Sequence, residues 1–227
     1  MKNIDLEIKK GEFVCIIGEV GTGKSSLMHS LFGDMIHVQQ NVAEEFRTTK
    51  LSKETKEEIS MRIKSANIGI GQHTPILLSG SLSLAQQTPW IQNKTIRDNI
   101  LFGEPLDEER YNKTLELCEL TSDLEVLPGG DLTEIGEKGI NLSGGQKARV
   151  SIARAVYAQR DIILLDDPLS ALDSNVKTKV FENLLERHLA GTTRILVTHA
   201  VDFLDRVDRI IVMENGEAKH VGSFEEL

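Results

Sequence analysis

The sequence is poor in cysteine and in aromatic residues, and it has no long apolar segment. Of its 227 residues, 2 are cysteines and 4% are aromatic. Cys15 and Cys118 lie in apolar patterns without the C-x-x-C spacing of redox and metal sites, so we expect both to be reduced core residues of a cytosolic protein. No uninterrupted apolar run approaches the ~20 residues that a membrane-spanning helix needs. These shortages argue against a disulfide-stapled scaffold and against a spanning helix within this chain.

Basic residues are also scarce relative to acidic ones. Lys and Arg number 26 against 35 Asp and Glu, which gives a formal net charge of −9. This balance argues against a protein that reads the phosphate backbone of nucleic acids, so we expect no nucleic-acid partner. With 40% hydrophobic and 27% charged residues, the chain has the composition of a globular protein that buries one large core or two small ones.

Short apolar strands alternate with helical patterns along the chain. This alternation is typical of an α/β fold in which helices connect the strands of a wound sheet. The tail favours a small antiparallel portion, because its two apolar runs flank an Asn-Gly pair of the kind found in tight hairpins. The strands are expected at 13–17, 162–165 and 195–197, the helices at 26–32 and 176–189, and the hairpin at 209–222.

Two segments interrupt this pattern. Helical periodicity over 107–128, and a further helix from Ser143, predict an inserted helical lobe at about 95–158. A polar insert at about 37–79 carries one capped helical pattern, at 55–66, which we interpret as a short surface helix in a tolerated insertion. The sheet core then comprises about 1–90 and 160–227, and the whole chain is interpreted as one domain.

The segment GEVGTGKS, between the first strand and the first helix, fits the pattern G-x-x-x-x-G-K-[ST]. Its glycines let backbone N–H groups turn toward phosphate oxygens, and the lysine adds a positive charge for the β and γ phosphates. The serine hydroxyl is a ligand for Mg²⁺. The predicted nucleotide-binding residues are Gly18, Glu19, Val20, Gly21, Thr22, Gly23, Lys24, Ser25 and Ser26.

The strand at 162–165 runs into two adjacent aspartates. Asp166 is placed at the carboxyl edge of the sheet, where such folds bind ligands and where a carboxylate is able to hold Mg²⁺. Asp167 lies one residue further along, where an attacking water would wait. A proline follows, so the competing interpretation is that Asp167 caps a turn.

A second candidate anion site precedes another helix. Ser143, Gly144 and Gly145 stand at its start, where free N–H groups and the positive end of the helix dipole face outward. One chain has little use for two half-sites for one triphosphate unless the sites meet across a dimer. This part of the sequence therefore predicts a partner domain.

With these motifs in order, the chain resembles the ABC ATPases. LSGGQ resembles their signature motif, which comprises Leu142, Ser143, Gly144, Gly145 and Gln146. The segments 18–25 and 162–166 are similar to the Walker A and Walker B motifs, and Asp173 ends a D-loop-like SALD. The resemblance implies ATP and Mg²⁺ as cofactors, with Ser25, Gln87 and Asp166 around the metal and Asp167, Gln87 and His199 acting in catalysis.

Gln87, three residues before Trp90, resembles the Q-loop glutamine, which in the family senses Mg²⁺ and the attacking water and contacts the membrane domain. Trp90 would otherwise be interpreted as a core residue. The resemblance further implies a second nucleotide-binding domain in a head-to-tail ATP sandwich. It also implies transmembrane domains and a place at the cytosolic face of a membrane.

The segments 89–103 and 127–157 resemble one subfamily in particular: the first nucleotide-binding domain of C-subfamily, multidrug-resistance-associated exporters. Two departures matter. The family's adenine-stacking aromatic lies upstream of the first strand, so we expect this chain to be a fragment or a trimmed domain. The residue after the Walker B aspartate is usually a glutamate, and Asp167 is one methylene shorter, about 1 Å, which is expected to cost on the order of 10²-fold in rate.

Three functions are compatible with these features. The first is an ATP-binding and ATP-hydrolysing domain of an ABC-type exporter with weak hydrolysis at its own site. The second is an ATP-gated regulatory module with little hydrolysis. The third is a soluble ABC ATPase, which is disfavoured because basic linkers and coiled-coil arms are absent from the sequence.

Overall fold

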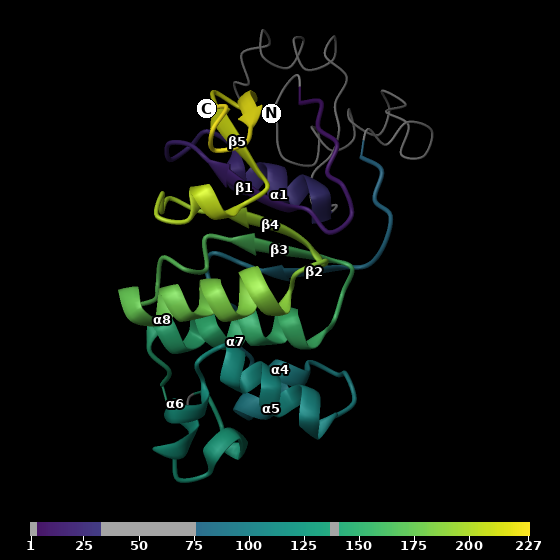
Figure 1. The fold of residues 1–227 in the computed structure, drawn as a ribbon. Coiled ribbons are helices and arrows are strands. Elements are labelled where there is room, and N and C mark those ends of the chain that lie inside the picture. Colours follow the sequence, from purple (N-terminus) through teal and green to yellow (C-terminus); the bar gives the residue numbers. More distant parts are fainter. Residues whose placement is uncertain (1–3, 33–75, 137–140) are drawn as a thin grey trace, which may run out of the picture. The chain divides into compact units, whose positions relative to one another are not determined.

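The computed structural model describes residues 4–32, 76–136 and 141–227 (Figure 1). Its internal contacts divide the chain into two units, one of residues 1–28 and 80–227 and one of residues 29–79. The surface helix expected at 55–66 lies outside the described residues. The first unit contains the sheet and the motifs discussed above.

A six-stranded sheet forms the centre of the first unit, with the strand order β2-β3-β4-β1-β5-β6. The β1, β2, β3, β4 and β5 strands are parallel, and β6 pairs antiparallel with β5. The strands are β1 (Phe13–Ile17), β2 (Leu82–Ala85), β3 (Ile162–Asp166), β4 (Thr193–Val197), β5 (Arg209–Glu214) and β6 (Glu217–Gly222). The predicted α/β class and the predicted strands at 13–17, 162–165 and 195–197 are confirmed.

The hairpin expected at 209–222 is also present. Asn215 and Gly216 both have positive φ, 49° and 80°, which is the conformation that an Asn-Gly hairpin turn requires. The pairing of β5 with β6 is irregular between Val212 and Met213. The antiparallel portion predicted from the sequence is therefore confirmed as this one strand pair.

The β2 strand was not predicted. It is four residues long and stands at the end of the strand order. Ser83 and Ala85 are its buried residues, whereas Leu82 and Leu84 are half-buried. Because small residues face the core and leucines face outward, the usual hydrophobic signal of a strand is reversed.

Helices α4 (Ile96–Leu101), α5 (Glu108–Leu117), α6 (Thr121–Glu125) and α7 (Gly144–Tyr157) follow β2. The α7 helix packs against β2 and β3 on one side, and α4 and α5 pack against α7 (Figure 1). The single helical pattern expected over 107–128 is split, because Glu119 has a φ of 53° and ends α5 before α6 begins. A short 3₁₀ helix, η1 (Gly130–Leu132), comes next.

The helix expected over 176–189 begins at α8 (Ser174–Lys179) and continues as a π-helix, η2 (Val180–His188). Val180, Phe181, Leu184 and Leu185 are buried along it. The wider hydrogen-bonding pattern, with Leu189 N donating to Leu184 O at 2.9 Å, had no signature in the sequence.

Cys15 and Cys118 are free and buried, as predicted. Burial raises the pKa of each thiol to about 12, which leaves both as inert core residues. Among the described helices, none is long and apolar enough to cross a membrane.

Candidate functional site

The candidate site is assembled at the carboxyl edge of the parallel strands. Since β1, β2, β3 and β4 run in one direction, the residues that follow them gather at one edge. The loop at Gly18 follows β1, and Gln87 follows β2. Asp166 is the last residue of β3 and Asp167 comes directly after it, while His199 follows β4.

The loop between β1 and α1 (Lys24–Phe32) depends on glycine at its first position. Gly18 has a φ of 146°, and a Cβ there would lie 2.3 Å from the carbonyl oxygen of Met213. Gly21 and Gly23 also have positive φ. The hairpin turn supports the loop from the other side, because Gly216 N donates to Thr22 O at 3.0 Å. This backbone conformation presents N–H groups at the loop without side chains in the way.

The Lys24 side chain is directed back into this loop. It is 6% exposed, and its Nζ donates to the carbonyl oxygens of Gly18 and Glu19 at 2.8 Å each. Burial lowers the pKa of Lys24, and the charges of Asp167 and Asp166 partly oppose that effect. A buried ammonium held by neutral carbonyls is suited to exchange those partners for phosphate oxygens. Among the other predicted loop residues, Val20 is exposed and Ser26 lies in the first turn of α1.

Two oxygen atoms that suit a magnesium ion stand side by side next to this lysine. Ser25 Oγ donates to Asp166 Oδ1 at 3.1 Å, and Asp166 is 5% exposed. A hydroxyl and a carboxylate at the end of a strand are hard oxygen donors of the kind that Mg²⁺ prefers. The residues present therefore fit the ion that the sequence predicted.

Asp167 has an unusual backbone and a buried side chain. Its φ is 48°, its residue is 6% exposed, and its Oδ1 has no hydrogen-bond partner among the described residues. Burial raises the pKa of Asp167, while hydrogen bonding by Ser170 and the nearby His199 partly lower it. The following turn is closed at the main chain, where the Asp167 carbonyl accepts from the Ser170 hydroxyl at 2.8 Å.

Gln87 and His199 are both exposed at this edge. The backbone N–H of His199 is among the groups that interact with the Asp167 carboxyl. Trp90 is 54% exposed, so its interpretation as a core residue was wrong. Its ring lies under the Arg154 guanidinium, 5.7 Å from the ring centre, and Phe102 packs edge-on at 6.0 Å.

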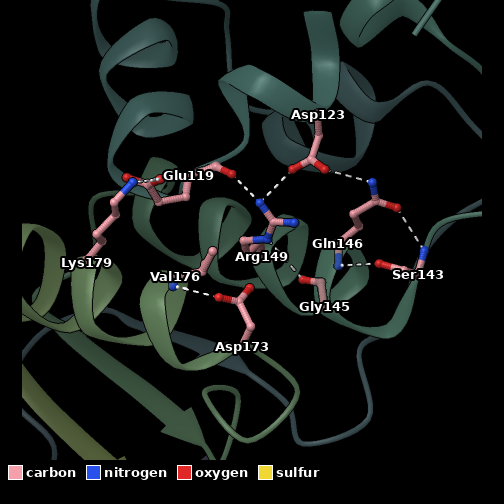
Figure 2. A network of polar contacts seen from close by, with 9 residues as sticks. All are labelled: Glu119, Asp123, Ser143, Gly145, Gln146, Arg149, Asp173, Val176 and Lys179. Atoms are coloured by element: carbon pink, nitrogen blue, oxygen red, sulfur yellow. Dashed lines mark hydrogen bonds and ion pairs between the residues drawn. The ribbon is translucent and has the colours of Figure 1, made fainter. Parts of the chain in front are cut away.

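The predicted signature forms the start of α7, where it closes a capping box (Figure 2). Ser143 Oγ accepts from Gln146 N at 3.2 Å, and Gln146 Oε1 accepts from Ser143 N at 2.9 Å. Ser143 and Gly144 are exposed, whereas Leu142 is buried in the core. The helix start is thus satisfied by its own side chains while its first residues remain accessible.

The candidate D-loop touches this helix start. Asp173 caps α8 by accepting from Val176 N at 3.1 Å. The carbonyl oxygen of Ala171, just before it, lies 3.1 Å from the point where a Cβ of Gly145 would stand. A larger residue at 145 would therefore push against the D-loop.

Sequence reasoning missed the residues that hold the capping box in place. Asp123 accepts from Gln146 Nε2 at 2.8 Å and forms an ion pair with Arg149 Nη1 at 2.6 Å (Figure 2). Arg149 also donates to the carbonyl of Glu119. Asp123 lies 20 residues before Ser143, and no motif connects the two.

Comparisons with known proteins agree with this geometry. A family model described as "ABC transporter" matches residues 1–170. The Homo sapiens ATP-binding cassette sub-family C member 3 is 43% identical over 226 residues, which are 99% of this chain and 13% of that protein. The ABC transporter C family member 8 from Dictyostelium discoideum is 45% identical over 230 residues, which are 100% of this chain and 12% of that protein.

The chain thus spans about an eighth of the length of these relatives. The motifs in the sequence predicted this similarity to the C subfamily, and it extends over the whole chain, including the insert at about 37–79. The family match includes the loop at Gly18, the signature and the two aspartates that follow β3. This chain belongs to the ABC transporter family.

Proposed function

We propose that this chain is the ATP-binding and ATP-hydrolysing domain of an ABC-type exporter, located at the cytosolic face of a membrane. The observation that carries the proposal is the cluster at the carboxyl edge of the sheet. There the buried Lys24 ammonium, the Ser25 hydroxyl and the Asp166 carboxylate stand together beside a loop that only glycine at position 18 permits.

Each group in the cluster has a separate task in ATP binding. The N–H groups of the loop and the first turn of α1 hold phosphate oxygens, and Lys24 contributes a charge-assisted bond to the β and γ phosphates. Ser25, Asp166 and Gln87 would hold Mg²⁺. When bound, this ion neutralises phosphate charge and orients the γ-phosphoryl group.

Asp167 is proposed to accept a proton from the attacking water. A raised pKa brings a carboxyl closer to the range in which a general base works well at neutral pH. Its Oδ1 has no hydrogen-bond partner among the described residues, which supports a role for the carboxylate other than capping. Gln87 and His199, exposed at the same edge, would position the water and the γ-phosphate.

We propose that the signature, Leu142–Gln146, serves the nucleotide of a second nucleotide-binding domain. When two domains pair head to tail around two ATP molecules, the start of α1 contacts one ATP and the start of α7 contacts the other. Transmembrane domains outside this chain would take up the motion, with Gln87 near their contact. The length of the relatives, of which this chain matches about an eighth, supports such a larger assembly.

A second candidate function is an ATP-gated regulatory module with little hydrolysis. Asp167 favours it, because its side chain is a methylene shorter than the usual glutamate and has one buried oxygen without a hydrogen-bond partner in the described part of the chain. Single-turnover hydrolysis at this site, in the assembled transporter, separates the two functions.

The test is Lys24→Ala in the full transporter that contains this chain. We expect labelling of this domain by a photoreactive ATP analogue to weaken at least about tenfold, since a charge-assisted phosphate bond contributes about 1.5–3 kcal/mol. Lys113→Ala is the matched control, because Lys113 is exposed on α5 and pairs with Glu116. Unchanged labelling of the Lys24 variant would remove the loop from the proposed ATP site.

A further inference from the structure

Asp123 contacts the signature from a different helix. It lies in the short α6 helix, and both of its carboxylate oxygens are used (Figure 2). Oδ1 accepts from Gln146 Nε2, and Oδ2 forms an ion pair with Arg149 Nη1 at 2.6 Å that lacks the geometry of a hydrogen bond. The side chains of Asp123 and Arg149 are 20% and 12% exposed, so this pair is largely shielded from solvent.

The carboxylate determines which way the Gln146 amide faces. An ionised carboxylate is an acceptor without donors, so the NH₂ end of Gln146 must face Asp123. The carbonyl end of Gln146 then faces Ser143 N–H, which it accepts at 2.9 Å. With the Ser143 N–H used and Ser143 Oγ accepting from Gln146 N, the helix start offers outward the N–H groups of Gly144 and Gly145 and the Ser143 hydroxyl hydrogen.

Arg149 fixes the other side of the same helix start. Its Nε donates to the carbonyl of Gly145 at 3.3 Å, and its Nη1 reaches both Asp123 and the carbonyl of Glu119. Across from it, Gly145 lies against the carbonyl of Ala171. The residues that would face a phosphate are therefore held from two directions.

We propose that Asp123 is a positioning residue for the signature: through Gln146 it fixes the donor pattern that α7 presents to the ATP of the partner domain. The proposal rests on the proposed function, and it adds a residue outside every motif that the sequence revealed. Asp123 does not touch ATP in this scheme, and it acts by holding the capping box and the Arg149 guanidinium.

The test is a cycle of Asp123→Asn, Gln146→Glu and the double variant in the full transporter. In Asp123→Asn, the Arg149 guanidinium attracts the new amide oxygen, so the new NH₂ faces the NH₂ of Gln146 and turns that amide away from Ser143 N–H. In Gln146→Glu, two carboxylates face each other. In the double variant, the new NH₂ donates to the new carboxylate, whose second oxygen again accepts from Ser143 N–H.

We expect each single variant to lower hydrolysis at the partner domain's site about tenfold, and the double variant to recover to within about threefold of the unmodified transporter. Labelling of this domain's own P-loop by the photoreactive ATP analogue should stay unchanged in all three, which also reports that the domain is folded. A fall in both single variants without recovery in the double would overturn the proposal, as would unchanged hydrolysis in Asp123→Asn.

Glu119→Gln is the matched control at the same corner. It removes the ion pair of Glu119 with Lys179, 3.0 Å long, but leaves the Glu119 carbonyl and the capping box in place. We expect hydrolysis to remain within about twofold, because partly exposed pairs contribute little. If this control lost as much hydrolysis as Asp123→Asn, the loss would come from general destabilisation of this part of the domain and not from the positioning role of Asp123. The outcome is independent of Lys24→Ala, which tests the ATP site itself.

Discussion

Two helix starts in the described part of this chain are proposed to bind anions, and they are built differently. At α1 the preceding loop contains glycines with positive φ, a buried lysine and neighbouring oxygens from β3. At α7 the start is closed by its own capping box and held by Asp123 and Arg149. The first start keeps its lysine on loop carbonyls that a phosphate is able to replace. At the second, the capping box leaves the N–H groups of Gly144 and Gly145 and the Ser143 hydroxyl hydrogen as the donors for a nucleotide.

This difference explains how one chain would contact two ATP molecules in the proposed dimer. A site that binds ATP by itself needs a positive charge whose hydrogen bonds to the protein are readily replaced by bonds to phosphate oxygens, and Lys24 supplies this charge. A site that completes a partner's nucleotide needs a fixed geometry before the partner arrives, since preorganised donors cost less to align at closure. If the two helix starts have these separate tasks, substitutions at each should affect different nucleotides.

The largest effect is expected from Ser143→Arg. The substitution removes the cap and puts bulk and charge where the start of α7 would face the partner's γ-phosphate. We expect ATPase activity of the paired domains to fall on the order of 10²-fold, as when one preorganised donor is removed from a reaction centre. Steady-state phosphate release by the full transporter measures it. Activity within about threefold of the unmodified transporter would show that this helix start does not act in hydrolysis.

A smaller gain is expected from Asp167→Glu, tested where the catalytic glutamate of the partner domain has been disabled. The added methylene should bring the carboxylate within reach of the attacking water and raise hydrolysis at this site about tenfold or more. ATP affinity should change little, because a general base acts mainly in the transition state.

Two outcomes oppose this interpretation. If Asp167→Asn leaves a measurable rate at this site unchanged, the carboxylate does not act as the base. If Asp167→Glu raises nothing, the length of the side chain is not what limits this site.

The smallest effect concerns pH. A base works when deprotonated, and burial raises the pKa of Asp167. Hydrolysis at this site should therefore rise with pH through a range above that of an ordinary aspartate, near 3.9, and level off once the carboxyl is ionised. A pH–rate profile of single-turnover hydrolysis measures this limb. Its persistence in Asp167→Asn would assign it to another group.

The sequence predicted much of the fold because the strands that carry it are strongly apolar. The β1, β3 and β4 strands are buried on both faces, and the Asn215-Gly216 pair determines the hairpin. The β2 strand was not predicted because its core-facing residues are the small Ser83 and Ala85. The π-helical hydrogen bonding after Lys179 was not predicted because the apolar stripe of this segment is also compatible with an α-helix.

The candidate site was predictable where its residues are close in sequence. The loop at Gly18, the aspartates after β3 and the box at Ser143 each follow from a local pattern. Asp123 did not, because an isolated aspartate in a short polar helix has many possible roles until its partners are known. The roles of Gln87 and His199 remain predictions from the family resemblance, and both residues are exposed.

The most direct test of the two-nucleotide account is site-resolved labelling of the full transporter with a photoreactive ATP analogue, assigned to each domain by mass spectrometry. Lys24→Ala and Ser143→Arg are compared under conditions that stop hydrolysis. The account predicts that Lys24→Ala weakens labelling of this domain's own loop at least about tenfold, whereas Ser143→Arg leaves it intact and weakens retention of nucleotide on the partner domain. If Ser143→Arg removed the label from this domain's own loop and spared the partner's, both helix starts would serve one nucleotide and the account would be wrong.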